Sequence, residues 1–299
     1  MGRDTSKVCP RGPSAAPMHR GSLPENTKSV SGWHVPGCCE DMNGEDPGVL
    51  RVMSYNVYGC VDAHRRINLS RIVQIIDAIS PDAIALQEVD YEKPLSANRN
   101  QARSISERLG LDYCYEPLEK MGRHAFGLAI LSRHPLEKPA FTLLPNLHAS
   151  LNMRKRGAMR AVIRTPIGEI DFINTHLSVF RIERYLQLRA VMQWSDLVRR
   201  SRERPVIFCG DLNAKPGSLS YRSVTRYLTD VQKAPNLSSR PEPTFPAKVP
   251  TFRIDHIFIS HHYRIDHCKV VRNALTIEAS DHLPLMAELK RHSADKSLQ

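Results

Sequence analysis

Short apolar segments alternate along the chain with two stretches of helical periodicity. The apolar segments have the length and residue types of buried strands. Apolar side chains at positions 69, 72, 73, 76 and 79 share one face of a helix, so a helix is expected over Leu69–Ile79. A second amphipathic pattern predicts one long helix over Arg181–Arg200. The predicted strands are Val49–Val57, Ala83–Val89, Gly127–Ser132, Ala158–Arg164, Glu169–His176, Pro205–Cys209, Ile254–Ser260, Cys268–Arg272 and Pro284–Leu289.

The order of these elements favours an α/β fold built on two packed mixed sheets with helices outside. Helices are few and fall between runs of strands, and Thr165-Pro166-Ile167-Gly168 has Pro and Gly where a hairpin turn needs them. No linker interrupts residues 49–291, which we expect to form one domain. Residues 1–48 are rich in Pro, Gly, Ser and Asn and predict a flexible leader, and residues 292–299 predict a frayed tail.

Six short polar motifs stand where apolar strands should end. Each places a carboxylate, an amide or an imidazole at the edge of a buried sheet, and together they supply the parts of a metal-assisted phosphoester hydrolase. The motifs are Ser54-Tyr55-Asn56-Val57, Gln87-Glu88, Asn174-Thr175-His176-Leu177, Gly210-Asp211-Leu212-Asn213, Ile254-Asp255-His256 and Ser280-Asp281-His282.

Asn56 and Glu88 are candidates for a metal site. A carboxylate delivered to the edge of a buried sheet is costly unless it meets a cation, and oxygen ligands suit Mg²⁺ or Mn²⁺. The alternatives are an exposed strand end for Glu88 and a turn residue for Asn56.

Asp211 and Asn213 form a second candidate group. They share one face if the chain stays extended, and Gly210 between the strand and this motif allows a close backbone approach. The alternative for that motif is a simple turn.

Asp255 is the most informative single residue. Strand alternation places it on the same face as Ile257 and Ile259, so a carboxylate points among core side chains and needs a partner. His282 is the predicted partner, because a carboxylate can orient an imidazole and raise its basicity. His176 closes a predicted strand and is a candidate phosphate ligand, and a structural role is the alternative for both histidines.

These motifs in combination resemble the endonuclease/exonuclease/phosphatase superfamily, over roughly residues 49–291. The resemblance implies a deoxyribonuclease I-like, four-layered α/β sandwich and a Mg²⁺-dependent hydrolase. It also implies roles for single residues: Asn56, Glu88 and Asp281 at the metal, His176 at the scissile phosphate, Asp211 and Asn213 at the nucleophile, and His282 with Asp255 as base or phosphate ligand. Either Asp211 or His282 is then the residue that takes the proton.

Charge favours an anionic substrate. The 299-residue chain has a net charge of +11 and a pI of about 9.5, and residues 1–48 carry five basic and six acidic groups, so the remainder carries 11 + 1 = +12. Basic residues cluster at Arg154-Lys155-Arg156 and around Arg199-Arg200.

The seven scattered cysteines, with no signal peptide or apolar span, predict a cytoplasmic protein with reduced thiols. A metal site at Cys38-Cys39 is the alternative for that pair.

The substrate is predicted only as a class. A phosphodiester, with nucleic acid as the first choice, fits the charge. Gln87-Glu88 continues as Val89-Asp90, which departs from the QE-x-K of abasic-site endonucleases, and Thr251–His256 lacks the WCDR signature of inositol 5-phosphatases. The segment from Thr244 to Phe258 resembles a bacterial branch of the superfamily, and Ser54–Tyr58 its sphingomyelinases. A lipid or head-group phosphodiesterase and a non-catalytic phosphate-binding module are the alternatives.

Overall fold

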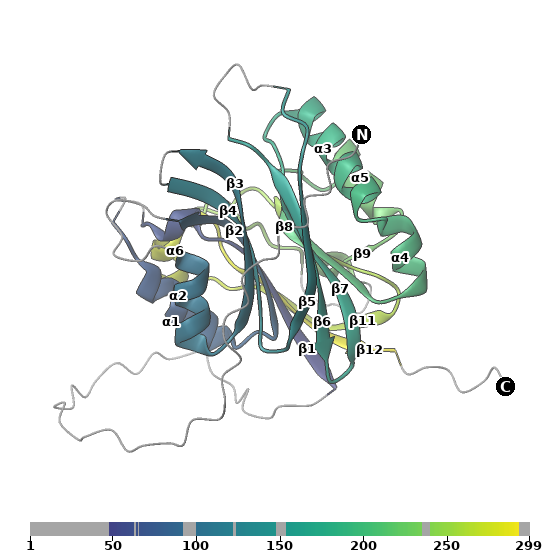
Figure 1. The fold of residues 1–299 in the computed structure, drawn as a ribbon, viewed down its shortest axis with the longest axis horizontal. Coiled ribbons are helices and arrows are strands. Elements are labelled where there is room, and N and C mark those ends of the chain that lie inside the picture. Colours follow the sequence, from purple (N-terminus) through teal and green to yellow (C-terminus); the bar gives the residue numbers. More distant parts are fainter. Residues whose placement is uncertain are drawn as a thin grey trace.

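The protein is a four-layered α/β sandwich in which two sheets stack face to face and helices cover both outer faces (Figure 1). The computed structural model describes residues 48–62, 64, 66–91, 100–121, 124–147, 154–234 and 240–292. The predicted leader and the Cys38-Cys39 pair lie outside these residues, as does nearly all of the predicted tail. Within the described residues, no helix is long and apolar enough to cross a membrane.

The first sheet has the strand order β11-β12-β1-β2-β4-β3 and the second β5-β6-β7-β8-β10-β9. Both sheets repeat one pattern of directions, with a single parallel pair at the centre and antiparallel strands on either side. The strands of the first sheet are β1 (Val49–Asn56), β2 (Ala83–Tyr91), β3 (Asp112–Met121), β4 (His124–Ser132), β11 (Tyr263–Val270) and β12 (Leu285–Arg291). Those of the second are β5 (Leu136–Leu143), β6 (Gly157–Thr165), β7 (Gly168–His176), β8 (Val206–Asp211), β9 (Thr229–Asp230) and β10 (Asp255–Ile259).

Three apolar cores hold the layers together. The central core lies between the sheets, and its side chains include Val52, Leu128, Phe172 and Ile207. One outer core packs α1, α2 and α6 on the first sheet, and the other packs α3, α4 and α5 on the second. The helices are α1 (Leu69–Ile79), α2 (Gln101–Leu109), α3 (Arg181–Trp194), α4 (Leu197–Glu203), α5 (Leu219–Thr225) and α6 (Ala274–Ala279), with 3₁₀ turns at Tyr58–Cys60 and Val231–Lys233.

The helix predicted over Arg181–Arg200 is wrong in one respect, because the structure has two helices there. Asp196 adopts a left-handed conformation with φ of 51°, which breaks the helix between Trp194 and Leu197. The Ser195 hydroxyl donates a hydrogen bond of 2.7 Å to the carbonyl of Val191 and closes the first helix. The apolar period continues across the break, so periodicity alone predicts one helix.

A buried amide pair ties the two sheets together beside the candidate site. Gln87 in β2 donates a 2.8 Å hydrogen bond to the side chain of Asn174 in β7, and both residues are fully buried. The Asn174 amide in turn donates to the carbonyls of Leu86 and Ala129, at 2.8 Å each. Two of the polar motif residues therefore serve the fold, because they hydrogen-bond to each other where the sheets meet.

Candidate active site

Strand register brings the polar motifs to one edge of the sandwich. In the first sheet Asn56 ends β1 and lies beside Gln87 of the parallel strand β2. In the second sheet His176 ends β7 and pairs with Asp211 at the end of β8, and Asp211 also lies opposite Asp255 of β10. Because the ends of parallel strands meet at one edge, side chains from distant parts of the chain become neighbours.

Glu88 does not end its strand, contrary to the expectation from sequence. It lies inside β2 at an irregularity in the pairing with β4, and its φ of 57° is in the left-handed region. Such bulges re-aim a side chain without ending the strand. The bulge brings the Glu88 carboxylate to 3.4 Å from the Asn56 amide nitrogen and 3.4 Å from Arg154 Nη1.

Asp211 and Asn213 are brought together by a turn, which is the alternative that the sequence left open to an extended chain. The backbone N–H of Asn213 donates to Asp211 Oδ1 at 2.9 Å, and Asn213 has a φ of 49°. The turn brings both side chains to His176, with Asp211 Oδ2 at 3.3 Å and Asn213 Nδ2 at 3.4 Å from its Nε2. The motif therefore forms a turn that holds both side chains beside His176, and its role as a catalytic site stays a prediction.

Gly210 approaches the neighbouring strand so closely that no side chain fits, as the sequence predicted. A Cβ atom there would lie 2.1 Å from the carbonyl oxygen of Thr175, and the φ of Gly210 is 151°. Gly210→Ala should therefore lower the free energy of unfolding by about 3 kcal/mol, measured by urea denaturation. Gly110→Ala is the matched control, since Gly110 has a φ of 64° but no atom within 4 Å of its Cβ position. A cost at Gly210 no larger than at Gly110 would contradict the steric argument.

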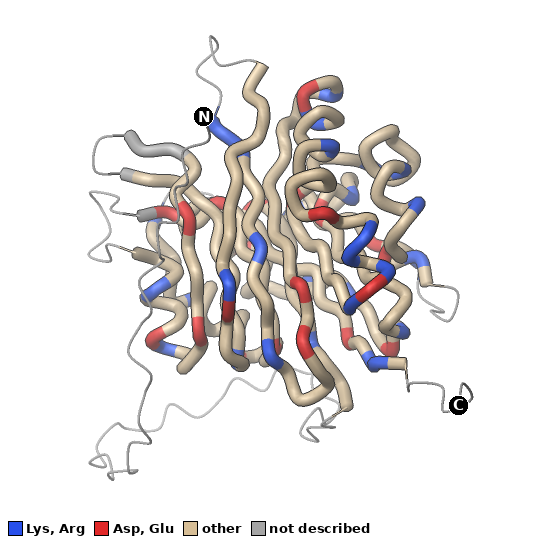
Figure 2. The backbone as a smooth tube through the Cα atoms, turned by 45° about the vertical axis from the view of Figure 1, so that its right-hand side comes forward, with Lys and Arg blue, Asp and Glu red and all other residues tan. Residues whose placement is uncertain are grey.

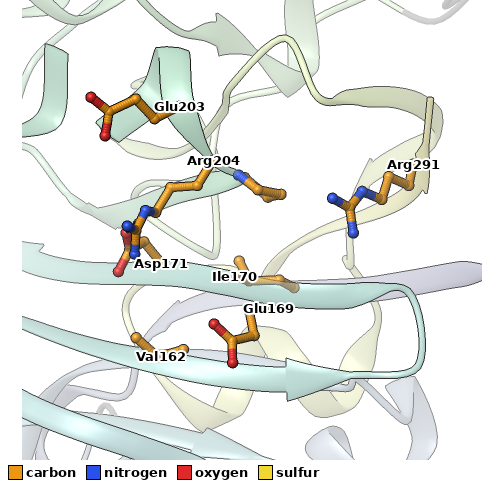
Figure 3. Close-up of a pocket in the computed structure, with 8 residues that line it drawn as sticks. Val162, Glu169, Ile170, Asp171, Glu203, Arg204 and Arg291 are labelled. Atoms are coloured by element: carbon orange, nitrogen blue, oxygen red, sulfur yellow. Dashed lines mark ion pairs between the residues drawn. The ribbon is translucent and has the colours of Figure 1, made fainter. Parts of the chain in front are cut away.

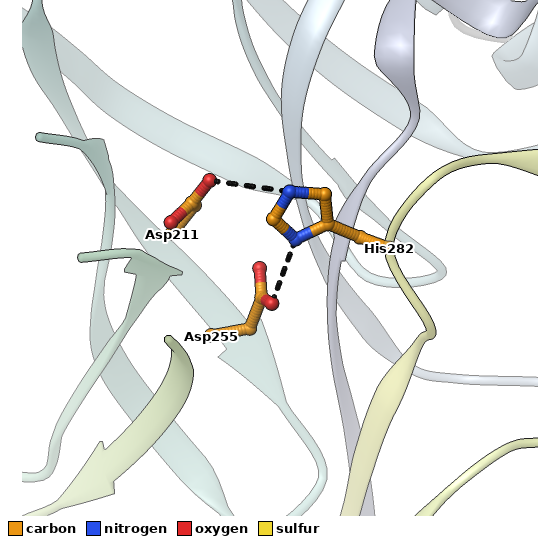
Figure 4. Close-up of side chains that lie close together, drawn as sticks. All are labelled: Asp211, Asp255 and His282. Atoms are coloured by element: carbon orange, nitrogen blue, oxygen red, sulfur yellow. Dashed lines mark hydrogen bonds and ion pairs between the residues drawn. The ribbon is translucent and has the colours of Figure 1, made fainter. Parts of the chain in front are cut away.

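His282 lies between two buried carboxylates (Figure 4). Its Nδ1 is 2.8 Å from Asp255 Oδ2, and its Nε2 is 3.7 Å from Asp211 Oδ2. Asp255 is fully buried and also accepts a hydrogen bond of 2.5 Å from the Thr244 hydroxyl. His282 is therefore the partner that the inward-facing Asp255 was expected to need. Because Asp255 contacts Nδ1, the other ring nitrogen, Nε2, faces Asp211.

His176 meets a basic residue. Arg156 Nη1 lies 2.7 Å from His176 Nε2, so this guanidinium donates and the Nε2 accepts. The other ring nitrogen, Nδ1, is buried with no hydrogen-bond partner and lies 3.9 Å from Glu88. A buried N–H that faces the site and lacks a protein partner is suited to an anionic ligand.

Burial and mutual repulsion set the charge of the acids. Burial, together with the Asp255 carboxylate, raises the pKa of Asp211 to about 7. Burial raises the pKa of Glu88, against the opposing effect of Arg154, and burial also raises the pKa of Asp281. Repulsion from Asp281 adds to the rise at Glu88, so these two carboxylates act on each other across the site.

The two imidazoles differ in charge. Burial opposes the charged form of His282, but Asp255 and Asp211 outweigh it and raise the pKa of His282 to about 10. Burial and the charge of Arg156 lower the pKa of His176 well below its ordinary value. At neutral pH His282 is therefore cationic and His176 is neutral.

Two sets of residues have donor chemistry for a metal ion. Asp211, Asp255 and His282 place one ligand atom each within 4.8 Å of one another. In that set His282 is already bound to Asp255 through Nδ1, which neutralises the pair. Glu88, Asp281 and Asn56 offer oxygen atoms, and the two half-buried, partly compensated acids fit a hard divalent cation. Asn56 now turns its Nδ2 toward Glu88 and Asp211, so it would bind an ion only after its amide turns over.

Several residues of the site carried no individual prediction. Arg154 and Arg156 belong to a basic cluster visible in the sequence, but nothing there indicates that Arg156 reaches His176. Thr244 lies eleven positions before Asp255, and only the fold shows that it donates to that carboxylate. Ser280 donates a 2.7 Å hydrogen bond to the carbonyl of Asn56 and so joins the Ser280-Asp281-His282 segment to the end of β1.

A cavity of about 320 Å³ lies away from these residues (Figure 3). It opens near the start of β7 and the end of α4, whereas the candidate site lies at the end of β7. Its charged residues are of both signs, and Arg200 and Arg204 lie 3.0 and 3.7 Å from Asp171. The lining residues are Val162, Glu169, Ile170, Asp171, Glu203, Arg204, Pro205 and Arg291. None of the predicted site residues lines this cavity.

Two mixed six-stranded sheets between helical layers, with acids and imidazoles at one edge, define a deoxyribonuclease I-like α/β sandwich. The profile of the Endonuclease/Exonuclease/phosphatase family matches residues 53–282, and the chain belongs to this family, whose members are phosphoester hydrolases.

The chain is also similar in sequence or in fold to the following known proteins. The chain is 25% identical over 262 residues to the uncharacterized protein YbhP of Escherichia coli (strain K12), covering 80% of this chain and 96% of YbhP. An endonuclease/exonuclease/phosphatase from Beutenbergia cavernae superposes with a TM-score of 0.69 at 23% identity, covering 82% of this chain and 72% of that one. A mannosyl-6-phosphatase from Bacteroides thetaiotaomicron superposes with a TM-score of 0.65 at 21% identity, covering 80% and 99%. At these identities the solved structures are similar in fold.

Proposed function

We propose that the protein is a divalent-metal-dependent phosphodiesterase that cleaves a P–O bond by in-line attack of water. The observation that carries the proposal is the convergence of acids and an imidazole at one place. The Asn56 amide donates to Glu88 at 3.4 Å and to Asp211 at 3.1 Å, and the Asp255-bound imidazole of His282 lies beside Asp211. A phosphate bound at these residues together with a cation would meet positive charge and a proton acceptor at once.

Glu88, Asp281 and Asn56 are the proposed ligands of Mg²⁺ or Mn²⁺. The ion would supply positive charge to a phosphoryl oxygen and stabilise the leaving oxygen. Two observations support this choice: burial disfavours the ionised forms of both acids, and Asp281 repels Glu88. A cation removes both penalties, whereas the Asp255–His282 pair is already neutralised internally.

The protein side chains have separate proposed roles. Asp211, held by the N–H of Asn213 at 2.9 Å, accepts the proton of the attacking water, and the Asn213 amide orients a phosphoryl oxygen. His282 contributes a positive charge that Asp255 keeps in place. Neutral His176 donates its unpartnered Nδ1–H to a non-bridging oxygen, with Arg156 behind it fixing that tautomer.

An anionic phosphodiester is the proposed substrate class. The excess of +12 beyond residue 48 and the exposed Arg154 beside Glu88 support attraction of an anion to the site. Nucleic acid satisfies this requirement, and so does a lipid that carries a phosphodiester head group.

The test is turnover of bis-p-nitrophenyl phosphate, with p-nitrophenyl phosphate as the monoester comparison. We expect diester hydrolysis that needs Mg²⁺ or Mn²⁺, stops with EDTA, and falls by about 10²-fold or more in His282→Ala or Asp255→Ala. Circular dichroism and the melting temperature would show that each variant folds. Wild-type rates in both variants would overturn the proposed site. Absence of metal-dependent turnover, together with no shift of the melting temperature by Mg²⁺, would favour the non-catalytic binding module.

A further inference from the structure

Exposed apolar side chains gather around the mouth of the candidate site. Among the described residues, six of the eleven exposed large hydrophobic side chains lie in segments that lead into or out of the site strands at their catalytic ends. We call these six the apolar rim. The most exposed are Ile182 at 70% and Val249 at 68%, and the others are Leu147, Val179, Leu219 and Phe252.

Hydrogen bonds and ring contacts connect the rim to the catalytic residues. The ring of Phe245 packs 4.7 Å from that of His282, and the N–H of Phe252 donates to the carbonyl of Phe245 at 2.7 Å. Val179 lies three residues after His176 in the sequence, and its carbonyl accepts a hydrogen bond of 3.0 Å from Arg184 of α3. A surface that contacts these rim segments would therefore lie close to the site.

Exposed charge close to the rim side chains is basic, and the exposed acid Glu242 lies two residues before the last of the ranges that follow. Within the described parts of residues 144–156, 177–183, 212–220 and 244–253, every exposed charged residue is Lys or Arg. The one acid in these ranges, Glu183, is buried at 3% exposure. Elsewhere along the chain basic and acidic positions are intermixed (Figure 2). The exposed basic residues of the rim segments are Arg154, Lys155, Arg181, Lys215 and Lys248.

We infer that the apolar rim and its basic residues dock on an anionic phospholipid bilayer. Exposed aliphatic side chains gain free energy by entering the acyl boundary, and Lys and Arg beside them are attracted to anionic head groups. A substrate phosphate carried on a lipid head group would then face the site at the membrane surface. This last step rests on the proposed function, whereas the docking itself does not.

Two features favour a bilayer over nucleic acid or a protein partner. Five of the six rim side chains are Leu, Ile or Val, which cannot stack on bases, and the one aromatic ring, Phe252, is covered by Lys215 Nζ at 4.0 Å. The rim is also divided among separate segments, from Leu147 to Phe252. A protein interface needs one contiguous complementary core, but a bilayer accepts separate apolar anchors without matching their shape.

Sedimentation with vesicles tests the inference on the full chain. Wild-type protein should bind vesicles of phosphatidylglycerol mixed with phosphatidylcholine far better than phosphatidylcholine alone. Ile182→Ser with Val249→Ser should weaken binding by about tenfold or more, and Lys215→Glu with Lys248→Glu by at least about tenfold. The matched controls lie at the opposite end of the sandwich: exposed Tyr227→Ser for the apolar change and exposed Arg202→Glu for the charge change. Both controls should bind as wild type does.

Turnover of a soluble diester separates docking from catalysis. The Ile182→Ser, Val249→Ser protein should hydrolyse bis-p-nitrophenyl phosphate at the wild-type rate, since neither residue contacts the catalytic groups. Wild-type binding by the rim variants, or equal binding of wild-type protein to both vesicle types, would overturn the inference. So would loss of DNA or RNA binding in the rim variants when vesicle binding is unchanged. A chain that docks but shows no diesterase activity would overturn the proposed function and leave the docking in place.

Discussion

Asp211→Asn should lower kcat for diester hydrolysis by about 10³-fold or more, with the fold retained. The substitution keeps the size of the side chain. It also keeps an oxygen that can accept from the N–H of Asn213, which lies 2.9 Å from Asp211 Oδ1 in the wild-type protein. It removes the proton acceptor and the negative charge that lies 3.7 Å from His282 Nε2. A change confined to these properties should appear mainly in kcat, because an amide can still contact a bound phosphate.

Asp171→Asn is the matched control for Asp211→Asn. Both aspartates are 2% exposed and belong to neighbouring strands of the same sheet, but Asp171 lies near the start of β7 and Asp211 at the end of β8. The control should keep wild-type kcat even if its melting temperature falls, because it loses charge compensation for Arg200 at 3.0 Å. Equal losses of activity in the two variants would assign the effect to general destabilisation, and a wild-type rate in Asp211→Asn would remove Asp211 from the mechanism.

The central strands and α1 could be predicted from the sequence because their periods are strong. The apolar face of residues 69–79 gives the observed bounds of α1, Leu69–Ile79. The edge strand β5 was missed because none of its residues is buried and Glu137, Lys138 and Pro139 interrupt its apolar residues. An edge strand pairs on one side only, tolerates Pro and charge, and so shows little alternation in its sequence. The short helices α5 and α6 were missed because six or seven residues span less than two turns.

The candidate site was predicted as a set of residues, but its geometry was not. An apolar strand that ends on a polar group indicates a position at a sheet edge, as with Asn56 and His176. Backbone irregularities do not show in such a pattern: the bulge at Glu88 and the turn that ends at Asn213 both depend on a non-glycine residue with positive φ. The contact of Arg156 with His176 depends on pairing across the β6–β7 hairpin, which places Gly157 opposite His176. Long-range register of this kind is a property of the folded sheet.

Glu88→Gln should weaken the response to Mg²⁺ strongly. Losing one of two carboxylate ligands should raise the Mg²⁺ concentration for half-maximal activity by about 100-fold, and activity at low Mg²⁺ should be lost. The wild-type protein should gain about 2.7 kcal/mol of stability at a Mg²⁺ concentration 100 times the Kd, and the variant should gain almost none at that concentration. Thermal melts with and without Mg²⁺, alongside the activity titration, measure both effects.

Without Mg²⁺ the same substitution should leave the melting temperature equal or higher, because it removes a half-buried carboxylate that Asp281 repels. Glu288→Gln is the control: Glu288 lies in the same sheet, pairs with Arg51 at 3.2 Å and should keep the full Mg²⁺ response. A purely structural Glu88 would give the reverse pattern, with a lower melting temperature in the absence of metal and an unchanged Mg²⁺ shift. Opposite effects on stability and on metal response would therefore identify Glu88 as a ligand that the fold retains at a cost in stability.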